Sequence, residues 1–213
     1  MISDKKIAII IPVLNVGKNI LDFLKLIPDY VDKIFLIDDY CPLKTGKIAQ
    51  ESAYNRNKLS VIFNTRNLGV GGAVKVGYQK CIDENFDVAV KIDGDNQMDP
   101  SEIIKIIEPI VSEKFEYSKG NRFLKNSLIE NYPLSRFYGN IFLSFMSKLS
   151  SGYWDLFDPI NGFTAIKVET LKKLNLNKID NGYYFESDML FNLYHHKVKI
   201  KDVPVTIRYF KNQ

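Results

Sequence analysis

The stretch Val88-Ala89-Val90-Lys91-Ile92-Asp93-Gly94-Asp95 joins an apolar run to two closely spaced carboxylates. The apolar run predicts a buried strand of a parallel sheet. Because side chains alternate along an extended chain, Asp93 and Asp95 should project from the same face at the end of that strand. Two like charges at this spacing favour a divalent cation between them, shared with phosphate oxygens of a substrate. The alternative that these residues leave open is a solvated Asp-Gly turn.

Composition places the chain among folded globular proteins and argues against several classes. Its 213 residues suit one domain, with 46% hydrophobic and 25% charged residues. The formal net charge of +4 comes from basic residues spread along the chain, without the dense block that a nucleic-acid-binding tail needs. No run of ~18 apolar residues predicts a membrane span, and no signal-peptide pattern is found. The two cysteines form neither a zinc pattern nor a disulfide framework, so we expect reduced thiols and a cytoplasmic protein.

Strands and helices alternate through the first half of the chain. This alternation predicts an α/β fold with a mostly parallel, Rossmann-like sheet and helices on both faces. In such sheets ligands bind beyond the carboxyl ends of the strands, and four polar segments are expected there. The predicted strands are residues 7–11, 34–37, 61–63 and 88–92; the predicted helices are 20–27, 45–54, 69–82 and 103–110; the polar segments are 12–15, 38–39, 67–72 and 93–97.

The second half has a different pattern. Residues 134–149 are strongly apolar and aromatic at helical spacing, which predicts either a core helix or a helix that contacts a membrane. Short strands are predicted at 163–166 and 198–207, and a helix at 186–196. Neither a linker nor a repeat interrupts the chain, so we predict a single domain over residues 1–213.

Polar motifs near the predicted strand ends each allow a functional and a structural interpretation. The segment Gly69-Val70-Gly71-Gly72 at a helix start could cradle a phosphate with backbone amides, or only allow close helix packing. Asp38-Asp39 could accept hydrogen bonds from a ribose or base, or shape a turn. Arg122 could bind a phosphate through two parallel hydrogen bonds, or lie on the surface. Glu186 and Asp188 begin a helix, where acids commonly interact with the helix dipole.

In their order, these segments resemble the family 2 glycosyltransferases of GT-A fold, and in particular the polyprenyl-phosphate sugar transferases related to dolichol-phosphate mannose synthase. Each segment is short, and their common order along residues 7–209 makes the resemblance specific. Two departures are Leu14, where the family usually has an aromatic residue, and Tyr40-Cys41-Pro42, where it usually has Gly-Ser. The matching segments are Ile11–Asn15, Ile37–Asp39, Asn67–Ala73, Asp93–Pro100, Gly120–Phe123, Asp158–Phe163, Phe185–Asp188 and Val203–Tyr209.

The resemblance implies roles for three groups of residues: ligands for Mg²⁺ or Mn²⁺, contacts to a nucleotide, and basic side chains near the donor and acceptor phosphates. The metal positions are matched by Asp93, Asp95 and Gln97. The candidate nucleotide contacts are Pro12, Asn15, Asp38, Asp39 and Gly71. The candidate phosphate-binding arginines are Arg122, Arg136 and Arg208. Residues 1–112 would form a nucleotide-binding half of the domain, and residues 113–213 an acceptor-side half.

We therefore predict a metal-dependent, inverting transfer of a sugar from a nucleotide-diphosphate sugar to a polyprenyl phosphate, with Asp95 and Arg122 in catalysis. A phosphate acceptor is largely dianionic at pH 7 and needs charge pairing more than a general base. One alternative is transfer to a sugar hydroxyl of a glycan, for which Asp188 or Glu186 would supply the base. Another is a nucleotide-sugar-binding module without catalysis. A lipid acceptor implies a peripheral location at the cytoplasmic face of a membrane, with residues 134–149 as the contact.

Overall fold

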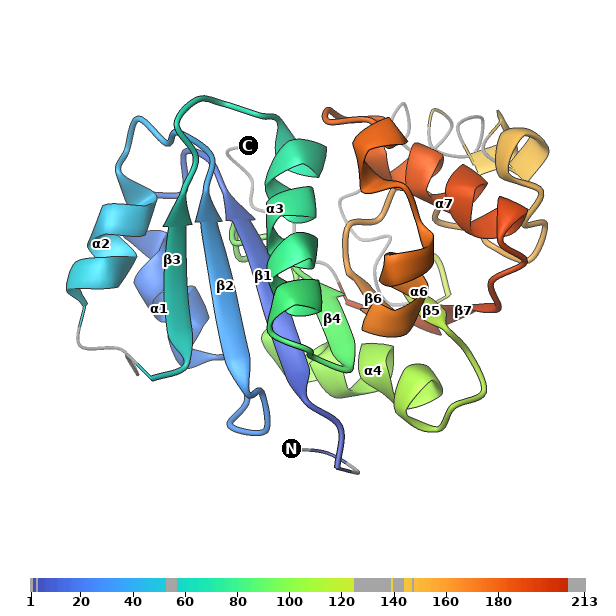
Figure 1. Ribbon diagram of the computed structural model, residues 1–213, viewed down its shortest axis with the longest axis horizontal. Helices are drawn as coiled ribbons and strands as arrows, with labels where there is room; N and C mark the ends of the chain where they lie inside the picture. Colours follow the sequence, from blue (N-terminus) through green and yellow to red (C-terminus); the bar gives the residue numbers. More distant parts are fainter. Residues whose placement is uncertain are drawn as a thin grey trace.

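The computed structural model describes residues 2, 4–52, 57–124, 139, 144–146 and 148–206. Helices and strands alternate through the first half of the chain, and the second half adds further strands to the same sheet (Figure 1). The elements are β1 (Ile7–Val13), α1 (Asn19–Lys25), β2 (Lys33–Asp38), α2 (Thr45–Glu51), β3 (Leu59–Phe63), α3 (Val70–Asp83), β4 (Val88–Lys91), η1 (Pro100–Glu102), α4 (Ile103–Val111), β5 (Tyr117–Asn121), β6 (Thr164–Lys167), α6 (Val168–Lys173), η3 (Leu176–Lys178), α7 (Phe185–His195) and β7 (Ile200–Pro204).

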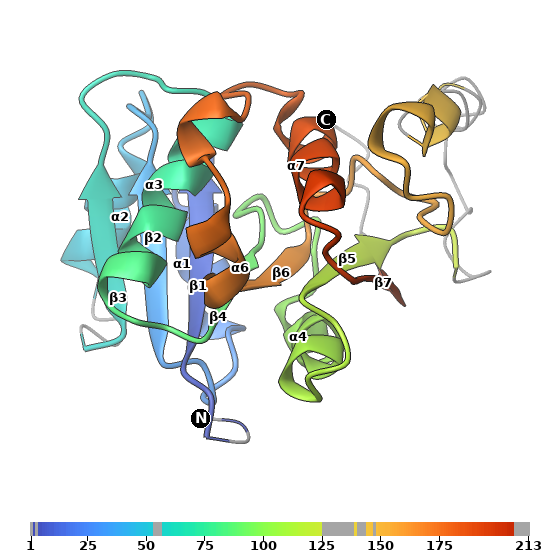
Figure 2. The same cartoon turned by 45° about the vertical axis from the view of Figure 1, so that its right-hand side comes forward.

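The strands form one seven-stranded sheet in the order β3-β2-β1-β4-β6-β5-β7. β1 pairs in parallel with β2 and β4, β2 with β3, and β5 with β7. β6 runs antiparallel to both of its neighbours, β4 and β5. The mostly parallel α/β sheet predicted from the sequence is therefore confirmed. β6 lies between β4 and β5 and is antiparallel to both (Figure 2).

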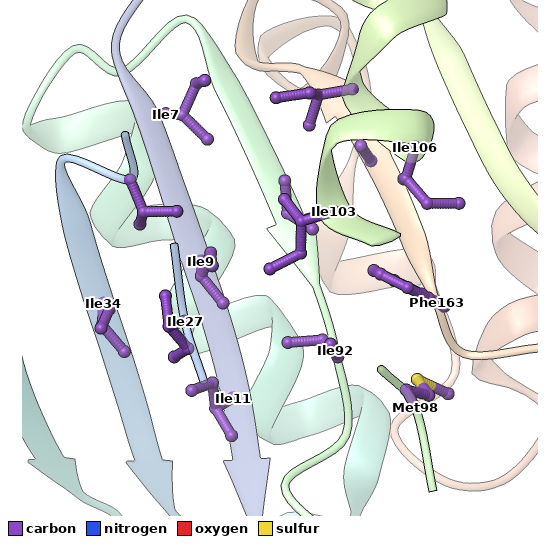
Figure 3. Close-up of a cluster of buried hydrophobic side chains, with 14 of the residues drawn as sticks. Ile7, Ile9, Ile11, Ile27, Ile34, Ile92, Met98, Ile103, Ile106 and Phe163 are labelled. Carbon is purple, nitrogen blue, oxygen red and sulfur yellow. The ribbon is translucent and has the colours of Figure 1, made fainter. Parts of the chain in front are cut away.

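Helices cover both faces of the sheet because its central strands alternate between two apolar clusters. On one face, Ile7, Ile9 and Ile11 of β1 pack with α1 and α4. Figure 3 shows these side chains with Ile103 and Ile106 of α4. On the other face, Ala8 and Ile10 pack against α3, in a cluster that also includes residues of α6 and α7. The side chains on both faces of β1 are thus buried, as expected for a central strand of a parallel sheet.

Some predicted bounds differ from the observed ones. The helix expected to reach residue 54 ends at Glu51, and the strand expected over residues 198–207 is Ile200–Pro204. Most of the aromatic stretch 134–149 lies outside the described residues. Of its described members, Phe145, Met146 and Leu149 are about half exposed. None of the helices described is both long and apolar enough to cross a membrane.

Candidate active site

A cleft of about 460 Å³ opens at the carboxyl ends of β1, β2 and β4. This is the sheet edge at which the polar segments were expected to meet. The cleft brings together three carboxylates, the N-terminal end of α3 and the segment that precedes α7. Its lining residues are Pro12, Val13, Leu14, Val16, Asp39, Asn67, Gly69, Val70, Ala73, Asp93, Gly94, Asp95, Gly182 and Tyr183.

Amide donors orient the carboxylate of Asp39. Its Oδ1 accepts hydrogen bonds from the side-chain amide of Asn64 at 2.7 Å and from the backbone amide of Leu68 at 2.9 Å. Its Oδ2 accepts from the backbone amide of Gly69, also at 2.9 Å. These bonds join the end of β2 to the segment that leads into α3, so Asp39 lies in the cleft in a defined orientation.

Asp38 and Asn15 do not line the cleft. The buried Asp38 carboxylate accepts hydrogen bonds from the backbone amides of Cys41 at 2.7 Å and Gly46 at 2.6 Å. Asp38 therefore holds the turn between β2 and α2. Asn15 is exposed, and its backbone amide donates to Sγ of Cys41 at 3.2 Å. Of the predicted nucleotide contacts, Pro12 and Asp39 are the ones in the cleft wall.

Asp93 and Asp95 lie together in the cleft, shortly after β4 ends at Lys91. The extended chain expected through Asp95 is wrong, because Gly94 and Asp95 form a turn. Asp93 Oδ1 is 3.2 Å from Nζ of Lys91. Oδ1 of Asp95 accepts a hydrogen bond from the backbone amide of Gln97 at 3.0 Å. Burial raises the pKa of Asp95, and the nearby charge of Asp93 raises it further. The ionised form of Asp95 is thus disfavoured by its surroundings, and a bound cation would stabilise it.

This donor set fits Mg²⁺ or Mn²⁺, because both ions prefer oxygen ligands. Within the part of the chain that the structure describes, no group of three or more His, Cys, Asp or Glu side chains could hold a metal ion. Asp93 and Asp95 therefore suit an ion whose other ligands come from a bound phosphate and water. Gln97, the third predicted ligand, does not line the cleft, and its described contact with Asp95 is through its backbone amide.

A buried chain of charges leads from Asp93 into the protein interior. Thr164 of β6 pairs in register with Lys91 of β4 and with Lys119 of β5, so the three side chains share one row across the sheet. Glu186 of α7 lies over this row. Its carboxylate is 2.8 Å from Nζ of Lys91 and 3.3 Å from Nζ of Lys119. Both lysine side chains are buried.

The two lysines keep Glu186 ionised. Burial alone raises the pKa of this carboxyl, but the ammonium groups of Lys91 and Lys119 outweigh burial and hold the pKa below its ordinary value. Glu186 is thus a counter-ion for two buried cations. Neither Lys91 nor Lys119 was predicted from the sequence, although a lysine inside the otherwise apolar run 88–92 was a usable signal for Lys91.

Arg122 pairs with Asp158 through two parallel hydrogen bonds. Nε donates to Oδ2 at 2.7 Å and Nη2 donates to Oδ1 at 2.8 Å. The side-chain amide of Asn161 donates to the same Asp158 Oδ2 at 3.1 Å, and Nζ of Lys119 donates to the carbonyl of Asn161. This ion pair, which lies outside the cleft lining, joins two of the segments that match the family: Gly120–Phe123 and Asp158–Phe163.

Glycines at the start of α3 allow a close approach by the segment before α7. A Cβ at Gly71 would lie 2.6 Å from the carbonyl oxygen of Asp180 and 2.7 Å from Cβ of Phe185. The amide of Gly72 donates to the carbonyl of Asn181 at 3.0 Å. This geometry supports the packing interpretation of Gly71, while Gly69 lines the cleft.

The carboxylate of Asp188 accepts hydrogen bonds from the segment before α7 and from α7 itself. Its Oδ2 accepts a hydrogen bond from the backbone amide of Asp180 at 2.7 Å, and its Oδ1 accepts from the side-chain amide of Asn192 at 3.2 Å. Neither Asp188 nor Glu186 lines the cleft.

Two of the predicted phosphate-binding arginines, Arg136 and Arg208, lie outside the described residues. Gly182 and Tyr183 line the cleft as well, and no local motif predicted them.

The family model for glycosyl transferase family 2 matches residues 8–174. The chain belongs to this family. The resemblance inferred from the ordered motifs is thereby confirmed, as is the prediction of a glycosyltransferase.

Curated relatives of this family 2 glycosyltransferase match most of the chain. A UDP-N-acetylglucosamine–dolichyl-phosphate N-acetylglucosaminyltransferase of Methanococcus voltae is 32% identical over 220 residues, which cover 97% of this chain and 87% of the relative. An undecaprenyl-phosphate mannosyltransferase of Micrococcus luteus is 27% identical, covering 81% of this chain and 70% of the relative.

Solved structures support the GT-A fold. Glucosyl-3-phosphoglycerate synthase of Mycobacterium tuberculosis, in complex with Mn²⁺, UDP and glucosyl-3-phosphoglycerate, has a TM-score of 0.73 at 18% identity. The match covers 99% of this chain and 74% of the synthase. The same synthase has also been solved with Mg²⁺ and UDP. At this identity the likeness shows the fold alone.

Proposed function

We propose that this glycosyltransferase moves a sugar, with inversion, from a nucleotide-diphosphate sugar to a polyprenyl phosphate. The observation that carries the proposal is the common cleft of Asp39, Asp93 and Asp95. β1 lies between β2 and β4, so Asp39 and Asp93 follow strands about 10 Å apart across the sheet. That spacing suits a nucleoside beside Asp39 and Pro12 and a diphosphate beside Asp93 and Asp95.

The two carboxylates at the end of β4 would hold Mg²⁺ or Mn²⁺. When bound, such an ion would neutralise negative charge on the leaving nucleotide diphosphate. The raised pKa of Asp95 supports this role, because burial and the neighbouring charge of Asp93 both disfavour its ionised form, and a bound cation would offset them. The complexes of glucosyl-3-phosphoglycerate synthase with Mn²⁺ or Mg²⁺ and UDP are consistent with it.

A phosphate acceptor fits the surroundings of the two candidate bases better than a hydroxyl acceptor does. A hydroxyl needs a base within hydrogen-bond reach. Glu186 is ion-paired with Lys91 and Lys119, and Asp188 accepts hydrogen bonds from Asp180 and Asn192. Both lie away from the cleft lining. The relatives from M. voltae and M. luteus are named for dolichyl and undecaprenyl phosphates, which supports a polyprenyl phosphate acceptor.

A lipid acceptor further implies contact with a membrane surface. Phe145, Met146 and Leu149 are about half exposed, and Trp154 and Phe157 are exposed as well. Lys148 lies 3.7 Å from the centroid of the Phe157 ring. Aromatic side chains beside a lysine suit the interface of a bilayer that contains anionic lipids.

A donor and acceptor screen tests the proposed function. The protein is incubated with Mg²⁺ or Mn²⁺, each of several UDP- and GDP-sugars, and a short polyprenyl phosphate, and the released nucleotide is measured. We expect release that depends on both the donor and the lipid phosphate. Release with a glycan acceptor but not with the lipid phosphate would favour the hydroxyl alternative. Donor binding without any transfer would favour a binding module.

A further inference from the structure

Tyr183 is strongly exposed and also lines the cleft. Its exposure of 96% is the highest among the exposed large hydrophobic residues of the described chain. It also lines the cleft that holds Asp39 and Asp93. An exposed tyrosine alone needs no explanation. An unpacked aromatic ring on the wall of a polar cleft is, however, available to a ligand.

Hydrogen bonds to two helices, α3 and α7, hold the backbone segment that leads to Tyr183. The amide of Gly72 donates to the carbonyl of Asn181 at 3.0 Å, which fastens the segment to α3. The amide of Asp180 donates to Oδ2 of Asp188 at 2.7 Å, which fastens it to α7. In both views of the fold, the segment before α7 lies beside the N-terminal end of α3 (Figures 1 and 2). The position of Tyr183 is thus defined although its ring is exposed.

Glycines make this attachment possible. A Cβ at Gly69 would lie 2.5 Å from the carbonyl oxygen of Asn181, which is too close for any other residue. Gly69 has φ +81° and ψ 163°, a backbone conformation that is essentially restricted to glycine. The start of α3 and the segment at Tyr183 therefore form one continuous wall of the cleft.

We propose that the ring of Tyr183 binds the nucleoside of the donor by stacking on its base, an inference that rests on the proposed function. Aromatic side chains stack on any nucleobase because every base has a π face. The ring shares the cleft with Pro12 and Asp39, the candidate nucleoside contacts. A polyprenyl chain is a poorer occupant of this wall, because the carboxylates of Asp93 and Asp95 line the same cleft and an alkyl chain cannot satisfy their charge.

Isothermal titration calorimetry with UDP and with GDP, each in the presence of Mg²⁺, tests this assignment. The variants are Tyr183→Ala, Tyr183→Phe and the matched control Tyr184→Ala. Tyr184 is the next residue, is 78% exposed and is not among the residues that line the cleft. We expect Tyr183→Ala to weaken binding of the preferred nucleotide about 10-fold or more. Tyr183→Phe and Tyr184→Ala should each stay within about 2-fold, with unchanged melting temperatures.

The remaining outcomes separate the assignment from the proposed function. Unchanged nucleotide affinity in Tyr183→Ala, or an equal loss in Tyr184→Ala, overturns the assignment while leaving the proposed function in place. A raised KM for the lipid phosphate at unchanged nucleotide affinity also overturns it, and places the ring on the acceptor side. If the native protein binds neither nucleotide, the proposed function fails first and the assignment fails with it.

Discussion

Oε1 of Glu186 accepts a hydrogen bond from Nζ of Lys91 at 2.8 Å, in the buried contact between α7 and the sheet. The two residues are 95 positions apart in the chain. The same carboxylate also neutralises Lys119, which β6 brings into the same row of side chains. Because Lys91 also pairs with Asp93, this relationship connects the cleft to the packing of α7.

Replacing Glu186 should destabilise the protein in a pH-dependent way. Glu186→Gln leaves two buried ammonium groups with too little counter-charge, so we expect a free energy of unfolding about 3–5 kcal/mol lower at pH 7. The pKa of Glu186 is lowered from 4.5 in the folded state. Its contribution is therefore fully present above about pH 4.5 and is lost as the pH falls through the folded-state value. Urea unfolding measured from pH 7 to pH 3 checks both points.

The native protein and Glu186→Gln should converge in stability at low pH, where Glu186 becomes neutral. Glu169→Gln is the control, because Glu169 is an exposed acid and such surface changes stay within about 0.5 kcal/mol. A stability difference between native protein and Glu186→Gln that stays constant from pH 7 to pH 3 would contradict the counter-ion role.

Asp95→Ala should abolish sugar transfer while leaving the fold intact. The substitution removes one of the two carboxylates in the cleft. It also removes the unfavourable desolvation of a buried charge, which raises the pKa of Asp95, so the free energy of unfolding should not fall. Nucleotide release measures transfer, and circular dichroism measures folding. EDTA should inhibit the native protein, and Mg²⁺ or Mn²⁺ should restore it. Full activity of Asp95→Ala in the presence of EDTA would rule out the metal site.

Asp188→Asn should keep substantial activity if the acceptor is a phosphate. The asparagine retains an oxygen that can accept the hydrogen bond from the amide of Asp180, so the cleft wall should persist. Removing a general base typically costs ~10²–10⁴-fold in rate. A loss of that size in a folded Asp188→Asn, measured by nucleotide release, would favour the hydroxyl acceptor instead.

Gly69→Ala should destabilise the protein by about 1–3 kcal/mol, because the added Cβ meets the carbonyl of Asn181 and the backbone conformation is unfavourable for alanine. Gly139→Ala is the matched control, since a Cβ there would meet nothing within 4 Å. Thermal unfolding distinguishes the two variants. Nucleotide affinity should fall in Gly69→Ala alone, because the wall that carries Tyr183 is displaced. Equal melting temperatures for the two variants would contradict the close approach.

The protein should float with vesicles that contain anionic lipid at low salt, and less with neutral vesicles. The reason is the exposed group of Phe145, Met146 and Leu149 close to Lys148. The variant Phe145→Ser/Leu149→Ser should reduce flotation without lowering the melting temperature, because these side chains are about half exposed. If the native protein never floats with anionic vesicles, lipid delivery must depend on another part of the protein.

The sequence alone predicted the sheet, its cleft edge and the family, because these depend on local regularities. A strand such as β4 is recognisable from its apolar run, and the alternation of strands and helices implies where the carboxyl ends of the strands meet. Asp39, Asp93 and Asp95 come within four residues of a strand end, so their common position in the cleft could be inferred. The order of short motifs then pointed to family 2 before any contact was known.

Tertiary structure decided which charges are paired and which side chains complete the cleft. Glu186 begins a helix, and its sequence position is equally consistent with a base, a dipole partner or a counter-ion. Only the antiparallel register of β6, with Thr164 between Lys91 and Lys119, and the docking of α7 above it make Glu186 a counter-ion. Tyr183 reaches the cleft through the packing of its segment on α3. Local periodicity specifies each element, but such contacts depend on how distant elements pack, and no local pattern encodes that.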